Sequence, residues 1–359
     1  MLKAPILANF EAKSAAICIY LHKIRIFAPN TKQMPSFDQI RQDIDQYFQE
    51  SLDIQQSPQR LYAPIQYILA LKGKRVRALL TQLAYQAVSG EKPQNALKLG
   101  AALEMFHNFT LVHDDIMDNA PVRRGKATVH EKWDANVAIL SGDTMFALAM
   151  QWVVESFPQY AGQLAVAFTK AAIAVCEGQM EDMDFALTQK VSIPQYIEMI
   201  RKKTAVLMGA SLQIGALAGG ADAVLSQKIY RFGELAGIAF QLQDDLMDAY
   251  PPTHFGKQIG GDIIENKKTF LLLTALETAN EGQLNLLHDL LHLETNPAQK
   301  VAKVLEIYEA LQIRTQTEKA IEGYFGQARQ VGKELMAEIP QQRFEVIAEY
   351  LEEIAGRKV

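Results

Sequence analysis

The sequence predicts an all-α protein of about a dozen helices. Spacing, composition and proline placement all support this class. From Ser36 onward, apolar residues recur with helical spacing almost throughout. No stretch alternates convincingly between apolar and polar residues, and β-branched residues are sparse, which argues against strands. Prolines fall between the apolar blocks, where they begin or end helices, at positions 158, 194, 251, 252 and 340.

The helices can be placed in order along the chain. Ser36 is expected to cap the first, Pro64 to open a second that Gly73 interrupts, Asn95 to begin a third, and Pro121 to end it. Small residues recur in AAIAVCEG and ASLQIGALAGG, which indicates helices that approach closely in a bundle rather than a repeat solenoid. Further helical blocks are expected at 135–156, 160–187, 194–219, 223–249, 267–279, 283–293, 297–312, 315–338 and 341–356.

The segment 1–33 differs from the rest of the chain. Before Asp38 the only acidic residue is Glu11, against five basic residues. We interpret residues 1–33 as a poorly ordered extension or an upstream start, with Met34 as a candidate functional start; an accessory helix and a targeting peptide are the alternatives. Residues 34–359 contain no evident linker and are expected to form one domain, for which a hydrophobic content of 49% supplies ample core.

Composition narrows the classes of function. The formal net charge of -5 and the pI near 5.9 give no reason to expect a nucleic-acid partner. Cys18 and Cys176 lack metal-ligand spacing and exclude a disulfide framework, which fits a reducing, cytoplasmic location. No apolar run approaches the roughly 20 residues of a transmembrane helix, so stable membrane insertion is not expected.

Two similar acidic motifs each follow an apolar helical approach. They are TLVHDDIMD, with Asp114, Asp115 and Asp118, and QLQDDLMD, with Asp244, Asp245 and Asp248. In each motif the first and last carboxylates lie one helical turn apart and face the same way. One such motif alone is usually solvated surface, but two copies crowd carboxylates beside a core, which is costly without a cation. Because magnesium shares such oxygen ligands with substrate phosphates, the pair predicts a magnesium site that binds a diphosphate.

Basic residues cluster around the same motifs. Each pair alone would be interpreted as a solvated face, but their repeated association with glycine and the acidic motifs indicates more. Arginine binds phosphate through a planar fork and lysine as a point charge, so these residues could hold a second diphosphate without metal. The clusters are Lys74, Arg75 and Arg77 upstream, Arg123 and Arg124 after the first motif, Lys202 and Lys203 between the motifs, and Lys257, Lys267 and Lys268 after the second.

Between about Gly73 and Lys268 the chain resembles the trans-isoprenyl diphosphate synthases of the polyprenyl synthetase family. The resemblance rests on GKRVR, HNFTLVHDDIMDNAPVRRG, KKTA, FQLQDDLMD and FGKQIGGDIIENKKT, which occur in the family's order. It implies an isoprenoid-synthase helical bundle around a central cavity, commonly a homodimer. It also implies isopentenyl diphosphate and an allylic diphosphate as substrates, and Mg2+, about three ions per active site, as cofactor.

The resemblance implies roles position by position. The magnesium ligands would be Asp114, Asp115, Asp118, Asp244 and Asp248, with Asp245 in support. The catalytic set would be Lys203, Thr204, Gln241 and Lys257, of which the lysines, with Arg123, contact the allylic diphosphate and the other two flank the reacting allyl group. Isopentenyl diphosphate would contact Lys74, Arg77, His107 and Arg124, and Lys267 would join the substrate-binding residues. By its pattern alone, His107 would be interpreted as a core histidine.

Product length should depend on the helix just before the first motif. Thr110 and Phe109 lie four and five residues before Asp114, about one turn beneath it, and Phe106 lies a further turn down. Short-chain members of the resembled family carry an aromatic residue at the fifth upstream position, and the two-residue insertion of many bacterial farnesyl synthases is missing here. The resemblance therefore implies farnesyl or geranylgeranyl diphosphate as product, with geranylgeranyl slightly preferred.

Two alternative functions stay open. A type I terpene cyclase also ionises a prenyl diphosphate, but its second metal motif normally mixes Asn or Asp, Ser or Thr, and Glu. An inactive regulatory subunit of a synthase usually loses Asp or Arg residues from these motifs, whereas this chain keeps both sets. The C-terminal Arg357 and Lys358 either fold over the isopentenyl site or form a free solvated tail.

Overall fold

The computed structural model of the protein describes residues 36–52, 56–251, 259–292 and 296–356. The expected extension at 1–33, Lys257, Arg357 and Lys358 lie outside these ranges. The described residues from Phe37 onward form one compact unit by their contacts.

The N-terminal part of this unit is built from helices and one small hairpin. Its elements are α2 (Phe37–Ser51), α3 (Gln59–Ala70), α4 (Val76–Ser89), the 3-10 turn η1 (Pro93–Ala96), α5 (Leu97–Met117), β1 (Val122–Arg123), β2 (Lys126–Ala127), α6 (Val129–Lys132) and α7 (Ala135–Ser156). The remaining elements are η2 (Pro158–Tyr160), α8 (Ala161–Leu187), α9 (Ile193–Ile200), η3 (Arg201–Ala205), α10 (Val206–Ala218), α11 (Ala223–Ala249), α12 (Gly261–Ile264), α13 (Phe270–Thr278), α14 (Glu281–His292), α15 (Pro297–Ala310), α16 (Ile313–Leu335) and α17 (Gln341–Gly356).

The expected helices from residue 135 onward are confirmed to within about three residues at each end. Polar caps fix several starts, because a side-chain oxygen satisfies an N–H that the first turn leaves unpaired. Asp134 accepts from Val137 at the start of α7, and Ser192 forms a capping box with Gln195 at the start of α9. The block expected at 194–219 is not one regular helix, because the π-helical turn η3 divides α9 from α10.

Three local expectations were wrong. Pro64 lies buried inside α3 rather than at its start, so this helix contains a residue without a backbone N–H to donate. Asn95 lies in η1, which Pro93 begins, and α5 starts at Leu97. Strands β1 and β2 pair antiparallel around a turn in which Arg124 (φ 51°) and Gly125 (φ 73°) are both left-handed. This two-residue turn suits a short hairpin, which periodicity cannot reveal in strands of two residues.

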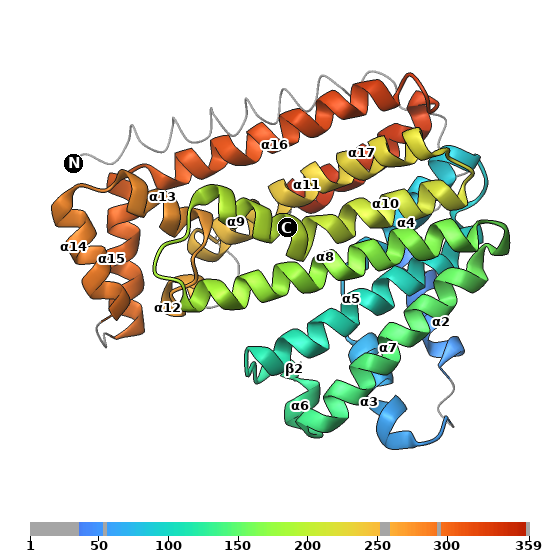
Figure 1. Cartoon of the computed structure of the whole chain (residues 1–359), viewed down its shortest axis with the longest axis horizontal. Helices are drawn as coiled ribbons and strands as arrows, with labels where there is room; N and C mark the ends of the chain where they lie inside the picture. The colour runs from blue at the N-terminus through green and yellow to red at the C-terminus, as the bar shows by residue number, and fades with distance from the viewer. Residues whose placement is uncertain (1–35, 53–55, 252–258, 293–295, 357–359) are drawn as a thin grey trace, which may run out of the picture. The chain divides into compact units, whose positions relative to one another are not determined.

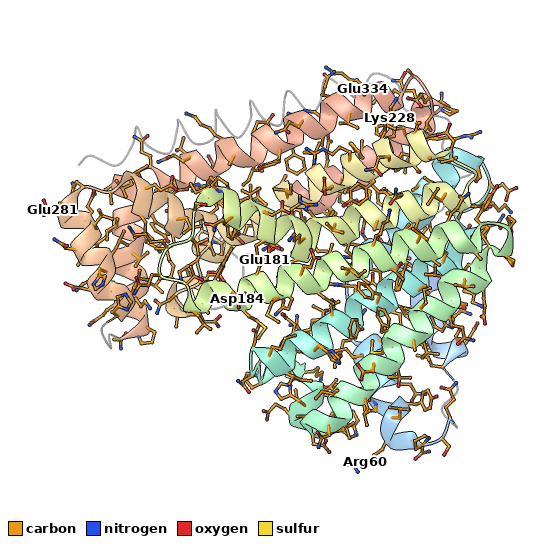
Figure 2. All side chains as sticks on the ribbon, in the orientation of Figure 1. Arg60, Glu181, Asp184, Lys228, Glu281 and Glu334 are labelled. Carbon is orange, nitrogen blue, oxygen red and sulfur yellow. The ribbon has the colours of Figure 1, made fainter. Side chains whose placement is uncertain are left out.

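Small residues allow close helix packing, as the sequence predicts. A Cβ on Gly215 of α10 would lie 2.1 Å from the backbone oxygen of Thr81 on α4. A Cβ on Gly100 of α5 would lie 2.9 Å from the oxygen of Ala78. Figure 1 shows α8, α10 and α11 side by side, and α16 packs along α11. Lys228 of α11 forms an ion pair with Glu338 just beyond α16, in the region where Figure 2 labels Lys228 and Glu334.

The core consists of two apolar clusters. One is formed mainly by α2 to α5, α7, α8, α10 and α17, and the other by α9, the second half of α11 and α13 to α16. Among the described helices, α7 is long and apolar enough to span a membrane by length and composition, although the sequence analysis found no such run. It packs along α5 within the bundle, and 39% of its apolar window is buried there.

Candidate active site

The two acidic motifs lie at the C-terminal ends of α5 and α11. They belong to one site, because the charge of Lys267 acts on Asp118 of the first motif, and Lys267 pairs at 3.7 Å with Asp262, whose N–H donates to Asp248 of the second. The structure therefore brings together motifs that are far apart in the sequence.

Asp114 combines burial with an unused acceptor. Its Oδ1 atom is buried without a hydrogen-bond donor, and its nearest cations are Lys203 Nζ at 3.5 Å and, on Oδ2, Arg123 Nη2 at 3.6 Å. Partial desolvation and the charge of Asp114 raise the pKa of Asp118. Such carboxylates are stabilised by a cation, because the charged form is otherwise disfavoured.

Asp115 is placed differently from its two neighbours in the motif. It is almost fully buried, and Arg123 Nε donates to both of its oxygens, at 2.8 and 2.9 Å. Burial raises the pKa of Asp115, while Arg123 opposes that shift. The contact fixes Arg123, and the predicted role of Asp115 as a metal ligand stays a prediction.

The second motif is arranged by local hydrogen bonds. Asp248 accepts from the N–H groups of Gly261 at 3.2 Å and Asp262 at 3.0 Å, at the start of α12. Burial and the charge of Asp248 raise the pKa of Asp262 to about 6. Asp244 interacts electrostatically with Arg77, which lies on α4. Asp262 was not among the predicted site residues, although its place in the GGD segment after the motif was a usable signal.

Asp245 is buried and organises a chain of hydrogen bonds. Tyr196 donates its hydroxyl to one carboxylate oxygen, and Gln241 Nε2 donates to the other at 3.0 Å. The amide oxygen of Gln241 then accepts the Thr204 hydroxyl at 3.0 Å. Burial raises the pKa of Asp245 to about 7. The predicted pair Thr204 and Gln241 is thus in direct contact, and the expected supporting place of Asp245 fits this geometry.

Lys203 lies among carboxylates. Besides Asp114, it pairs with Asp182 of α8 at 2.6 Å. Burial lowers the pKa of Lys203, but the charges of Asp114 and Asp182 outweigh burial and raise it overall. Asp182 was missed because no sequence motif surrounds it; only the packing of α8 against η3 brings it to this site.

A second cluster of candidate site residues consists of Arg77, His107 and Arg124, and its two guanidinium groups make it cationic. Burial and the surrounding guanidinium groups, first that of Arg77, lower the pKa of His107 well below its ordinary value, so this imidazole is neutral at pH 7. Burial also lowers the pKa of Arg77, whose Nε is a buried donor without an acceptor. Arg124 donates to the backbone oxygen of Leu71 at 3.3 Å from the hairpin turn. Crowded cations with an unused donor suit an anion.

The GKRVR segment divides between structural and exposed roles. Arg75 is 2% exposed and pairs with Asp45 at 2.8 Å, while its guanidinium also donates to the backbone oxygen of Leu69 at 2.5 Å. It therefore anchors the start of α4 and cannot reach a substrate. Lys74 is exposed, and its backbone oxygen accepts from Arg41 at 3.3 Å.

Aromatic side chains lie beneath the first motif. Phe109 contacts Phe106, with ring centroids 5.5 Å apart, and Phe146 of α7 at 5.6 Å. Phe168 of α8 completes the cluster, 5.1 Å from Phe106. Thr110 donates its hydroxyl to the backbone oxygen of His107 at 2.8 Å, which satisfies that polar group locally. Phe146 and Phe168 were missed because they are distant in sequence.

The donor set fits magnesium bound together with a diphosphate. Among the described residues, no group of three or more His, Cys, Asp and Glu side chains forms a preassembled metal site. Magnesium often takes only one or two carboxylates and completes its shell with water and phosphate oxygens. The buried Oδ1 of Asp114, which accepts no hydrogen bond, is compatible with such a ligand.

The chain belongs to the polyprenyl synthetase family, whose model matches residues 58–311. It is 40% identical over 223 residues to a geranylgeranyl diphosphate synthase of Methanosarcina mazei, covering 61% of this chain and 68% of that one. It is 35% identical over 268 residues to a short chain isoprenyl diphosphate synthase of Methanothermobacter thermautotrophicus, covering 74% and 81%. A crystal structure of a geranylgeranyl pyrophosphate synthase superposes with a TM-score of 0.85 at 38% identity, covering 91% of this chain and 100% of that one.

These matches confirm the family resemblance and the isoprenoid-synthase class of the all-α fold. They cover both acidic motifs and the basic segments between them. The matched region begins at residue 58, well after the segment 1–33, whose interpretation stays a prediction.

Proposed function

We propose that this protein is a short-chain trans-prenyltransferase that condenses isopentenyl diphosphate with an allylic diphosphate and releases diphosphate. The observation that carries the proposal is that α5 contributes to two anion sites of different chemistry. The first is rich in carboxylates around Asp114, and the second is rich in guanidinium groups around His107. Two diphosphate substrates, one bound through metal and one without metal, fit this pair.

The allylic diphosphate occupies the carboxylate side. Asp114, Asp118, Asp244 and Asp248 are the residues that would hold magnesium there, and Asp115 holds Arg123 against the same group. When bound, magnesium neutralises the diphosphate and makes it a better leaving group. Lys203 and Lys267, whose pKa values are raised, stay charged at neutral pH and bind the remaining phosphate oxygens.

Isopentenyl diphosphate occupies the guanidinium side, with Lys74, Arg77, His107 and Arg124. The unused Nε donor of Arg77 is available to a phosphate oxygen. Because His107 is neutral, it provides a hydrogen bond without adding charge to a cluster that is already cationic. No metal is needed on this side.

The reaction follows from the positions of the two substrates. The allylic carbon–oxygen bond breaks, and its electron pair leaves with the diphosphate. The double bond of isopentenyl diphosphate attacks the allylic cation, and loss of a proton to the departed diphosphate restores a double bond. The Thr204 hydroxyl donates a hydrogen bond to the amide oxygen of Gln241, so the lone pairs of the hydroxyl oxygen can face the cation. Gln241 is held in this orientation by Asp245.

Geranylgeranyl diphosphate is the proposed product. The half-buried Phe109 and the smaller Thr110 lie one turn below the metal end of α5 and set the depth available to the growing chain. Proteins named geranylgeranyl synthases are among the matched relatives, which supports this length over farnesyl diphosphate. The cyclase and the inactive-subunit alternatives are not favoured, because the matched relatives carry synthase names and both acidic motifs are intact.

A homodimer in the cytoplasm is the proposed state. The exposed sides of α7 and α8 carry large apolar residues, among them Leu140 (59% exposed) and Ile173 (60% exposed). Burying such a surface against a second copy would be favourable. Light scattering of the purified protein tests this: a mass of one chain would exclude the dimer.

The decisive experiment is incubation of the purified protein with isopentenyl diphosphate and either dimethylallyl, geranyl or farnesyl diphosphate. The assay is run with magnesium and with excess chelator, and the products are separated by chromatography. Magnesium-dependent elongation is expected. Release of a hydrocarbon or alcohol from one allylic substrate would indicate a cyclase. Absence of any product would reject both the prenyltransferase and the cyclase hypotheses.

A further inference from the structure

The π-helical turn η3 interrupts what would otherwise be one helix from α9 into α10. The N–H of Val206 donates to the oxygen of Arg201, five residues earlier. Such a turn adds one residue without breaking the backbone hydrogen bonds, and it is frequent at functional sites. One added residue shifts the side-chain register of α10 by about 100° from that of an uninterrupted α-helix. The turn lies where the two core clusters meet, since Ala205 belongs to one and Val206 to the other.

Consecutive side chains of this turn contact three neighbouring helices. The contacts are Arg201 with Glu234 of α11 at 2.8 Å, Lys202 with Glu181 of α8 at 2.5 Å, Lys203 with Asp182 of α8 at 2.6 Å and with Asp114 of α5 at 3.5 Å, and Thr204 with Gln241 of α11 at 3.0 Å. Glu181 is labelled on α8 in Figure 2. The direction of each side chain depends on the extra residue, so the position of the turn determines where Lys203 and Thr204 lie.

Two glycines hold the backbone of the turn at close range. A Cβ on Gly178 of α8 would lie 2.3 Å from the backbone nitrogen of Lys203. A Cβ on Gly237 of α11 would lie 2.7 Å from the Cα atom of Ala205. Both obstacles are backbone atoms, which cannot rotate away as the end of a flexible side chain can. Any larger residue must therefore displace the turn itself.

An ion pair secures the same turn on α11. The Glu234 side chain is 5% exposed and pairs with Arg201 at 2.8 Å and with Arg231 at 2.5 Å. Its remaining contact is the Tyr230 hydroxyl at 3.1 Å. A buried carboxylate needs such partners, and Arg201 is the one that belongs to the turn.

We propose that Gly178 and Gly237 are positioning residues for prenyl transfer. Their close backbone contacts set the place of η3, and thereby the distance of Lys203 from the leaving diphosphate and of Thr204 from the allylic carbon. This inference rests on the proposed function. Neither glycine touches a substrate, and both act through the turn.

Steady-state kinetics of Gly178→Ala and Gly237→Ala test the proposal. A displacement of about 1 Å at the reacting groups is expected to lower kcat by about tenfold to a hundredfold. The KM for isopentenyl diphosphate should change by less than about twofold, because its site is built from α4, α5 and the hairpin. Gly162→Ala is the matched control on α8, where a Cβ would meet nothing within 4 Å, and it should behave as wild type.

Glu234→Gln provides a second variant that adds no volume. It removes the negative charge that pairs with Arg201. It should lower kcat by a smaller factor than the alanine variants and leave the KM for isopentenyl diphosphate nearly unchanged, and it tests the proposal even if the alanine variants do not fold. Hydrogen exchange gives a readout apart from activity: the Val206 amide should lose protection in Gly178→Ala while amides of α16 keep theirs.

The outcomes separate this inference from the proposed function. A wild-type protein without prenyl transfer would reject the function, and the exchange data would still decide whether the glycines hold the turn. Wild-type kcat and unchanged Val206 protection in Gly178→Ala would overturn the inference. Equal losses in kcat and in isopentenyl binding would also overturn it, because they would indicate a general structural defect.

Discussion

Replacing Phe109 by alanine is expected to lengthen the prenyl product by one isoprene unit. Phe109 lies five residues before Asp114, about 7.5 Å along α5 at the usual rise per residue. Its ring contacts Phe146 of α7 at a centroid distance of 5.6 Å, so it closes the space between two helices. The substitution removes a phenyl ring, whose bulk is close to that of one isoprene unit. The next obstacle is Phe106, which is 1% exposed and fixed in the core.

The variant should remain folded. Truncation of a fully buried phenylalanine costs about 3 to 5 kcal/mol, and Phe109 is only half-buried, so about 2 kcal/mol is expected. For a chain of this size that loss lowers Tm by about 3 °C. A product assay at moderate temperature therefore compares folded proteins.

The assay follows chain length after incubation with farnesyl and isopentenyl diphosphates and chromatography of the dephosphorylated products. Phe344→Ala is the matched control, because it removes a buried ring of α17 that contacts Phe232 of α11, with ring centroids 5.0 Å apart, and that is not part of the proposed floor. It should lower stability and leave product length unchanged. The reasoning is refuted if folded Phe109→Ala makes the wild-type product, or if Phe344→Ala shifts chain length equally.

Three further substitutions probe the two anion sites and the buried carboxyl. Asp114→Ala should lower kcat by about a hundredfold or more, measured against the exposed acid control Asp143→Ala. Arg77→Ala should raise the KM for isopentenyl diphosphate about tenfold to a hundredfold, through loss of a charge-assisted contact, while Arg314→Ala on the surface should not. The pKa of Asp245 rises from about 3.9 unfolded to about 7 folded, so its protonated form favours folding below pH 4 and this contribution is lost as pH rises to 7. Between pH 4 and pH 7 the free energy of unfolding of wild type should fall by up to about 4 kcal/mol more than that of Asp245→Asn. Denaturation curves without metal at the two pH values measure this difference, and an equal fall in both proteins would contradict the prediction.

Local patterns predicted the helices because most of them are long and periodic. The same patterns could not predict η3, since a single added residue leaves the apolar composition of 194–219 unchanged. The short hairpin was also missed, because two-residue strands carry no period. Pro64 shows the limit of proline as a marker of helix ends, because it lies buried inside α3.

Site residues were predictable where a motif carries them. The acidic motifs, Arg77, His107 and the pair Thr204 and Gln241 follow from sequence, and the structure gathers them around α5 and α11. The difference between Arg75 and Arg77 does not follow from spacing, because it depends on Asp45 of another helix. Asp182 and Phe146 depend equally on tertiary packing, since no local signal marks them.

The hairpin between α5 and α6 links the two anion sites through adjacent residues. Arg123 binds the buried Asp115 of the carboxylate side, while Arg124, at the left-handed turn, reaches back to Leu71 beside the guanidinium side. Neighbouring Cα atoms are separated by about 3.8 Å, so the hairpin ties the positions of Arg123 and Arg124 to each other. In the proposed reaction the hairpin therefore couples the two diphosphate sites, between which the new carbon–carbon bond forms. Altering the turn would therefore move Arg124 relative to Arg123 and disturb both sites together.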